Sequence, residues 1–185
     1  MLLGVVCAGS LTAQDLQWEK HVFENYEFEF KTPANWHVTI NDSSSQIYIE
    51  CYSPDNQIYF FITSAENEKK SEPDIVLSYL KVTYENCEFI REETKKINNV
   101  EFVFSSGINR MSEIQTYIKL GVGKHKNRIY MIDSGYSEVN SEEADQILNE
   151  IINSVKAIHY FPFIVFPYSG HEEKNSHSWF RLCIF

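Results

Sequence analysis

The sequence predicts a single α+β domain, an antiparallel β-sheet flanked by two main helices, and three observations carry this prediction. Apolar and polar residues alternate along several short segments separated by turn residues, which is the period of half-buried strands. Two longer stretches instead show the helical spacing of apolar residues. The 185 residues are enough for one domain with a substantial core and too few to suggest two. We place this domain at residues 18–156.

The most regularly patterned segment is Tyr26–Trp36, with the sequence YEFEFKTPANW. Its first three aromatic rings alternate with charged residues, which predicts a strand with one aromatic face. Pro33 ends this strand, because proline has no N–H to donate to a neighbouring strand. We expect Phe28, Phe30 and Trp36 to be core residues rather than ligand contacts.

Further strands are predicted along the chain, each bounded by turn residues. They span residues 21–23, 37–40, 46–52, 57–64, 87–97, 100–106, 114–120 and 128–134. The short connections between consecutive strands make them antiparallel. Residues 121–127 are predicted to form a turn, and the Asn-Asn pair at residues 98–99 suits a tight hairpin.

Two helices are predicted from the spacing of apolar residues. The first begins at residues 71–74, where Ser, Glu, Pro and Asp form a typical helix start, and it ends near Asn86. Its apolar stripe is expected to contain Ile75, Val76, Tyr79, Leu80 and Val82. The second begins at Ser141, and its apolar residues recur every three or four positions from Ala144 to Val155, so one face is expected to lie on the sheet.

The two ends of the chain differ in composition from the domain. Residues 1–13 form a short apolar run ending in a small residue, which resembles a signal peptide although no basic residue precedes Lys20. This run predicts a secreted or periplasmic protein, with no membrane insertion after signal removal, since a membrane span needs roughly 20 apolar residues. Residues 157–185 form an atypical aromatic tail. Three interpretations of this tail are open: an extra edge strand, a segment that binds a partner, or a segment that does not belong to the domain.

The charge and the cysteines exclude some classes of function. A net charge of -10 argues against binding of nucleic acid or of an anionic membrane surface, because both need clustered Lys and Arg. After removal of residues 1–13 three cysteines remain, Cys51, Cys87 and Cys183, and an odd number is no disulfide framework. Cys51 and Cys87 either pair in an oxidising compartment or remain buried thiols.

Motifs for catalysis, cofactors and metals are weak in this sequence. Gly121-Val122-Gly123-Lys124 lacks the spacer and the following Ser or Thr of a phosphate-binding loop, so we expect a turn there. His171 and His177 lie six residues apart in the tail, which is poor spacing for a metal site. Glu27 and Glu29 are expected to be solvated charges. We therefore predict no catalytic residue, no cofactor and no metal.

Four tyrosines on the predicted strands, Tyr48, Tyr52, Tyr59 and Tyr117, form a possible protein-binding surface. Tyrosine is favoured at interfaces, because its ring is apolar and its hydroxyl is polar. The alternative is that the helices cover both faces of the sheet and leave these rings half-buried.

The order of elements resembles the PsbP-like domain, an α-β-α sandwich found in the extrinsic photosystem subunit, a yeast Ran-binding protein and small bacterial envelope proteins. The resemblance rests on residues 28–36, FEFKTPANW, and on residues 151–155, IINSV, and it covers roughly residues 22–156. It implies a non-enzymatic domain that binds another protein, and it carries over no active site.

The leading hypothesis is therefore a monomeric, secreted or periplasmic accessory domain that binds another protein without catalysis. The alternative is a small-ligand-binding protein or a hydrolase whose site is assembled from residues distant in sequence. A deep pocket holding two or more titratable groups within hydrogen-bond reach would favour this alternative.

Overall fold

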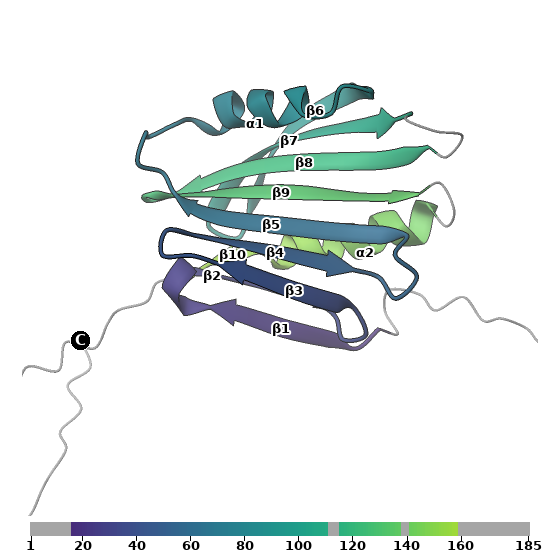
Figure 1. Cartoon of the computed structure of the whole chain (residues 1–185), viewed down its shortest axis with the longest axis horizontal. Coiled ribbons are helices and arrows are strands. Elements are labelled where there is room, and N and C mark those ends of the chain that lie inside the picture. Colours follow the sequence, from purple (N-terminus) through teal and green to yellow (C-terminus); the bar gives the residue numbers. More distant parts are fainter. Residues whose placement is uncertain (1–15, 111–114, 138–140, 159–185) are drawn as a thin grey trace, which may run out of the picture.

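The computed structural model describes residues 16–110, 115–137 and 141–158. Within these residues, seven strands form one antiparallel sheet in the order β3-β4-β5-β9-β8-β7-β6 (Figure 1). In chain order they are β3 (His37–Asp42), β4 (Gln46–Tyr52), β5 (Ile58–Glu66), β6 (Cys87–Ile97), β7 (Val100–Asn109), β8 (Thr116–His125) and β9 (Arg128–Ser137). A second, three-stranded antiparallel sheet has the order β1-β2-β10. Its strands are β1 (Trp18–Phe23), β2 (Phe28–Pro33) and β10 (Lys156–Ala157).

Two α-helices, α1 (Pro73–Val82) and α2 (Ser141–Ser154), pack against the seven-stranded sheet. Neighbouring strand residues belong to different apolar clusters, because side chains alternate between the two faces of a sheet. One cluster joins Phe104 to Ile147 of α2 and to Phe30 of β2, and we call this side the α2 face. The other joins Leu120 to Leu77 of α1, and we call this side the α1 face. The predicted antiparallel sheet with two main helices is therefore confirmed.

The aromatic segment at the start of the domain forms a core strand as predicted. Phe28 and Phe30 are fully buried on β2, and Trp36 is buried after a turn closed by the hydrogen bond from its N–H to the Pro33 carbonyl. Tyr26 departs from the predicted alternation. It ends a 3-10 helix (Glu24–Tyr26), and Glu27 then takes a left-handed backbone with φ of 57°.

The glycine-containing segment at residues 121–124 was predicted as part of a turn, and this prediction is wrong. These residues lie within β8, and the turn follows at Lys126, whose φ is 52°. A Cβ atom on Gly121 would lie 2.3 Å from Phe104, and one on Gly123 would lie 2.7 Å from Phe102. The two glycines therefore leave room for aromatic rings of the core.

The apolar stripe predicted for the first helix is wrong at three of its five positions. Ile75, Tyr79 and Val82 are exposed, whereas Leu77 is buried against the sheet. Only the partly buried Val76 and Leu80 face the same cluster as Leu77. The segment is apolar around most of its circumference, so spacing alone did not identify the face that packs. The second helix is as predicted, with its apolar residues buried from Ala144 onward.

The two described cysteines are both free thiols. Cys51 is fully buried on the α2 face, whereas Cys87 packs against the apolar cluster of the α1 face. The sheet lies between them, so the alternative in which they pair is wrong.

The predicted signal peptide at residues 1–13 and Cys183 lie outside the described residues. Of the tail that was predicted from residue 157, the structure describes only Ala157 and Ile158. Ala157 pairs with Phe28, so the small sheet includes the first residue of that tail. Among the described helices, none is long and apolar enough to cross a membrane.

Candidate functional site

A groove of about 540 Å³ lies on the α2 face, between α2 and the strands β6, β7, β8 and β9. Its floor contains a row of four polar residues, one from each of four neighbouring strands. Consecutive members are direct partners in strand register, and the row is Arg91, Ser106, Lys119 and Ser134. We call these four residues the polar row. It crosses a sheet face that is otherwise largely apolar, which makes it the most distinctive feature of that face.

The polar row is bordered by aromatic residues. On one side lies the buried ring of Phe104, and Gly121 is its partner on the neighbouring strand. On the other side, Tyr117 and Tyr136 are cross-strand partners whose rings stack at 5.1 Å between centroids. Burial and, next, the nearby Asp145 carboxylate raise the pKa of Tyr136 to about 12, so this phenol is neutral at physiological pH.

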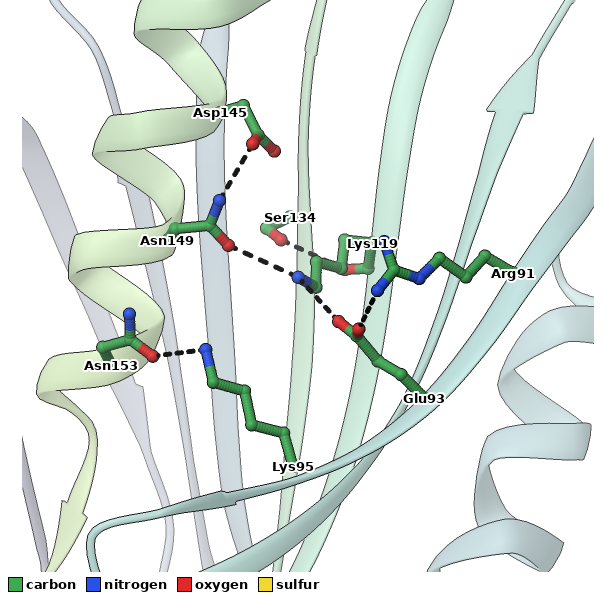
Figure 2. Close-up of polar contacts among 8 residues, drawn as sticks. All are labelled: Arg91, Glu93, Lys95, Lys119, Ser134, Asp145, Asn149 and Asn153. Atoms are coloured by element: carbon green, nitrogen blue, oxygen red, sulfur yellow. Dashed lines mark hydrogen bonds and ion pairs between the residues drawn. The ribbon is translucent and has the colours of Figure 1, made fainter.

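Lys119 lies at the centre of the groove floor. Its Nζ lies 3.4 Å from Glu93 Oε1 and 3.4 Å from Asn149 Oδ1 (Figure 2). The same atom lies 5.1 Å from the centroid of the Phe104 ring. Only 21% of its side chain is exposed. An ammonium group with so little access to water needs such compensating contacts.

The remaining polar groups of the groove come from β6 and from one edge of α2 (Figure 2). Glu93 Oε2 accepts a bond of 2.7 Å from Arg91, so this carboxylate links two cations. Lys95 donates to Asn153 Oδ1 at 2.8 Å. Asn149 in turn donates to Asp145 at 2.9 Å. Arg91, Glu93 and Lys95 reach the groove together, because alternate residues of a strand share one face.

The groove carries more positive than negative charge. Three cations, Arg91, Lys95 and Lys119, line it together with two acids, Glu93 and Asp145. The whole chain has a net charge of -10. A local excess of cations on an acidic protein favours an anionic ligand at this position.

Three of the four predicted surface tyrosines lie together on the α1 face. Tyr48, Tyr52 and Tyr59 surround Phe61, with ring centroids 5.9, 5.3 and 4.9 Å from it. All four rings are half-buried, and we call them the tyrosine face. Tyr117 does not join them, since it lies on the opposite side of the sheet, in the groove.

Two carboxylates lie within the tyrosine face. Glu50 and Asp133 are the strand partners of Phe61 on its two sides. Burial raises the pKa of Tyr48, and the nearby Glu50 carboxylate raises it further. No ion pair to Glu50 or to Asp133 is found among the described residues. Asp133 accepts a hydrogen bond from the Tyr84 hydroxyl. The uncompensated negative charge among these aromatic rings is therefore that of Glu50.

The other residues considered from the sequence do not converge on a site. Glu29 is ion-paired with Lys20 at 2.8 Å. Glu27 has its left-handed backbone outside β2. His171 and His177 lie outside the described residues. Within the described ranges, no three metal-ligating side chains come together.

Comparisons with known proteins reveal structural neighbours only. No family model matches the chain, and no curated protein matches its sequence. The solution structure of cyanobacterial PsbP from Synechocystis sp. PCC 6803 matches with a TM-score of 0.61 and 10% identity, covering 85% of this chain and 98% of that one. This chain has a PsbP-like fold.

Two further neighbours agree with the PsbP-like fold. The crystal structure of LpqN, which is involved in cell envelope biogenesis of Mycobacterium tuberculosis, matches with a TM-score of 0.51 and 9% identity, over 80% of this chain and 98% of that chain. A Bacteroides thetaiotaomicron protein matches with a TM-score of 0.50 and 16% identity, over 76% of this chain and 48% of its own. At such identities the likeness concerns the fold. The resemblance seen in the sequence is thereby confirmed.

Proposed function

We propose that this chain is a secreted or periplasmic accessory domain of the cell envelope, and that it binds another protein through the tyrosine face without catalysis. In this proposal the helices cover the sheet as in the α-β-α sandwich of PsbP-like domains. The envelope role of LpqN, a neighbour in fold, supports the setting.

The tyrosine face is the observation that carries the proposal. Four half-buried rings lie side by side on β4 and β5, and rings of this kind give large contact areas at little cost in side-chain entropy. Glu50 lies among them without an ion-pair partner among the described residues. Charge complementarity therefore favours a basic segment on the partner.

Site-specific photo-crosslinking in the native envelope tests this proposal. A photoreactive phenylalanine analogue replaces Tyr52 in one variant and Tyr79 in a matched control. Tyr79 is an exposed tyrosine on α1, a helix that packs on β7 and β8, whereas the tyrosine face lies on β4 and β5. We expect a discrete protein adduct from position 52 and none from position 79.

A charge reversal makes the test specific for a basic partner. Glu50→Lys, introduced into the position-52 crosslinking variant, is expected to reduce the adduct strongly, because it repels a basic segment. An adduct of equal yield from positions 52 and 79, or one unaffected by Glu50→Lys, would contradict the proposed surface. Fractionation of cells producing the full chain tests the location, which we expect to be outside the cytoplasm.

The groove favours a second candidate function, the binding of a small ligand. Arg91 and Lys119 each lie within bonding distance of Glu93, in a cavity with both aromatic and polar walls. Titratable groups within hydrogen-bond reach inside a cavity support the sequence-based alternative. The groove and the tyrosine face lie on opposite faces of the sheet, so one protein can have both functions.

A further inference from the structure

We propose that the groove binds a small carboxylate whose remaining part is aromatic or apolar. The carboxylate lies on the polar row, near Lys119, Arg91 and Ser106, and the apolar part lies against Tyr117 and Tyr136. This inference rests on the second candidate function, small-ligand binding, and names its ligand class. It is independent of the tyrosine face.

The first argument is the incomplete coordination of Lys119. An ammonium group has three N–H donors. Its two polar contacts, to Glu93 and Asn149, are both 3.4 Å long, beyond the distances of about 2.7–2.9 Å typical of charge-assisted hydrogen bonds. A ligand carboxylate can therefore form a shorter bond to Lys119 than either protein group does. Folding has already removed most of the water around this lysine, so ligand binding adds little further desolvation cost.

The second argument is the position of Arg91 and Ser106 beside this lysine. Ser106 is the register partner of both Arg91 and Lys119, so its hydroxyl lies between the two cations on the same face of the sheet. Arg91 is held by one contact, to Glu93, and 70% of its side chain is exposed. Its planar guanidinium has five donors and matches the two oxygens of a carboxylate. A carboxylate on the polar row thus meets two cations and a hydroxyl.

The third argument is the apolar border of the polar row. The stacked rings of Tyr117 and Tyr136 lie immediately beside the polar row. Each ring is two residues along its strand from a member of the row, Lys119 on β8 or Ser134 on β9, and so lies on the same face. Ile90 and Ile108 also line the groove, and Ile90 is 66% exposed. A carboxylate with an apolar substituent buries this exposed surface, whereas a bare anion leaves it wet. The volume of about 540 Å³ lies in the range of small-molecule sites, roughly 300–1,000 Å³.

The test uses three probes that share a benzyl group and differ in the group attached to it: phenylacetate, its neutral amide phenylacetamide and the cation 2-phenylethylamine. Binding is followed by amide NMR of the full chain, with the strand residues Ser106, Gly107 and Lys119 as reporters of the groove. We expect phenylacetate to shift these reporters in the millimolar range that is typical of small fragments. The amide and the amine are expected to bind at least about tenfold more weakly. The amide cannot form a charge-assisted bond to Lys119, and the positive charge of the amine is repelled by the two cations.

Two lysines of the same strand supply the matched variants. Lys119→Met keeps the length and apolar character of the side chain and removes the charge, so it should abolish the preference for phenylacetate over its amide. Lys124→Met is the control, since Lys124 lies on β8 but pairs with Glu72 next to α1, outside the groove. Arg91→Gln alters an exposed residue and is expected to weaken phenylacetate binding in a folded protein, even if Lys119→Met fails to fold.

The outcomes distinguish the proposed carboxylate ligand class from the more general candidate function, small-ligand binding by the groove. Stronger binding of phenylacetate that is lost in Lys119→Met and kept in Lys124→Met supports the proposed ligand class. Equal binding of all three probes overturns the ligand class and leaves small-ligand binding intact. No shift of the groove reporters by any probe, at concentrations of tens of millimolar, overturns both.

Discussion

The Tyr84 hydroxyl donates a hydrogen bond to Oδ2 of Asp133, and this contact ties the segment after α1 to the centre of the seven-stranded sheet. The other carboxylate oxygen, Oδ1, is buried without a hydrogen-bond partner among the described residues. Burial raises the pKa of Asp133 above its usual value, and the bond from Tyr84 opposes this rise. Asp133 is thus a half-buried acid with one satisfied oxygen and one buried, unsatisfied oxygen.

The raised pKa of Asp133 predicts a pH-dependent loss of stability. The folded protein binds this proton more readily than the unfolded chain, so the contribution of Asp133 to stability falls as pH rises above 3.8, its ordinary pKa, through the folded-state value. Asp133→Asn cannot ionise. The free energy of unfolding of Asp133→Asn, relative to that of the unmodified protein, is therefore expected to rise as pH is raised from about 4, as measured by urea denaturation.

A second aspartate provides a control of opposite sign. The Ser53 hydroxyl donates to Asp55 at 2.6 Å and lowers the pKa of Asp55. Its stabilising contribution is present above the unfolded pKa and is lost as pH falls through the folded value. Asp55→Asn should accordingly be more harmful at neutral than at acid pH. Parallel pH profiles for the unmodified protein and both variants would contradict this assignment.

Gly121→Ala is predicted to destabilise the domain by about 1–3 kcal/mol, the usual cost of overpacking a core. The added methyl group would lie 2.3 Å from Cε1 of Phe104, and this ring is fully buried and has little room to move. The measurement is the free energy of unfolding in urea. Phe104→Leu in the same chain should recover part of the Gly121→Ala loss. Strictly additive effects would show that the two positions do not compete for space.

The orientation of α1 is tested by two substitutions two residues apart. Leu77→Ala should cost about 2–5 kcal/mol, because Leu77 is 3% exposed in the apolar cluster of the α1 face. Tyr79→Ala should change stability by no more than about 0.5 kcal/mol, because Tyr79 is 71% exposed. Thermal unfolding of both variants gives the comparison. A larger loss for Tyr79→Ala would mean that the helix packs through the opposite face.

The two described cysteines should differ in their reactivity as thiols. Burial raises the pKa of Cys51 to about 12, so at mildly alkaline pH it is a protonated, inaccessible thiol. Cys87 is partly exposed and should react first with a thiol reagent. The experiment uses a chain in which Cys7 and Cys183 are replaced by Ser. We expect one fast thiol in the folded protein and two after denaturation, whereas a mass loss of two hydrogens without labelling would indicate a disulfide.

Most of the fold could be predicted because strand alternation is a local signal. The predicted limits of β4 and β6 agree with the structure, since each strand is bounded by turn residues on both sides. The packing face of α1 could not be predicted. Apolar residues occur around most of that helix, and contact with Leu120 on a distant strand decides which of them is buried.

The groove could not be found from spacing along the chain. Arg91, Ser106, Lys119 and Ser134 are separated by 13 to 15 residues, and strand register alone brings them into one row. The grouping of the tyrosines could be predicted only in part from the sequence. Tyr48 and Tyr52 are separated by an even number of positions on one strand, so they point to the same face. The face to which Tyr117 points depends on the register of β8, which the sequence does not reveal.

The pairing of β10 with β2 has a consequence for the order of events during synthesis. Phe28 lies opposite Ala157, more than a hundred residues later in the chain. At roughly 5–20 residues per second, a ribosome takes on the order of ten seconds to make the chain between them. During that interval β2 lacks one of its two partner strands, and the fully buried rings of Phe28 and Phe30 cannot yet pack on α2. The nascent chain therefore carries an exposed aromatic strand, the kind of segment that chaperones bind, until α2 emerges.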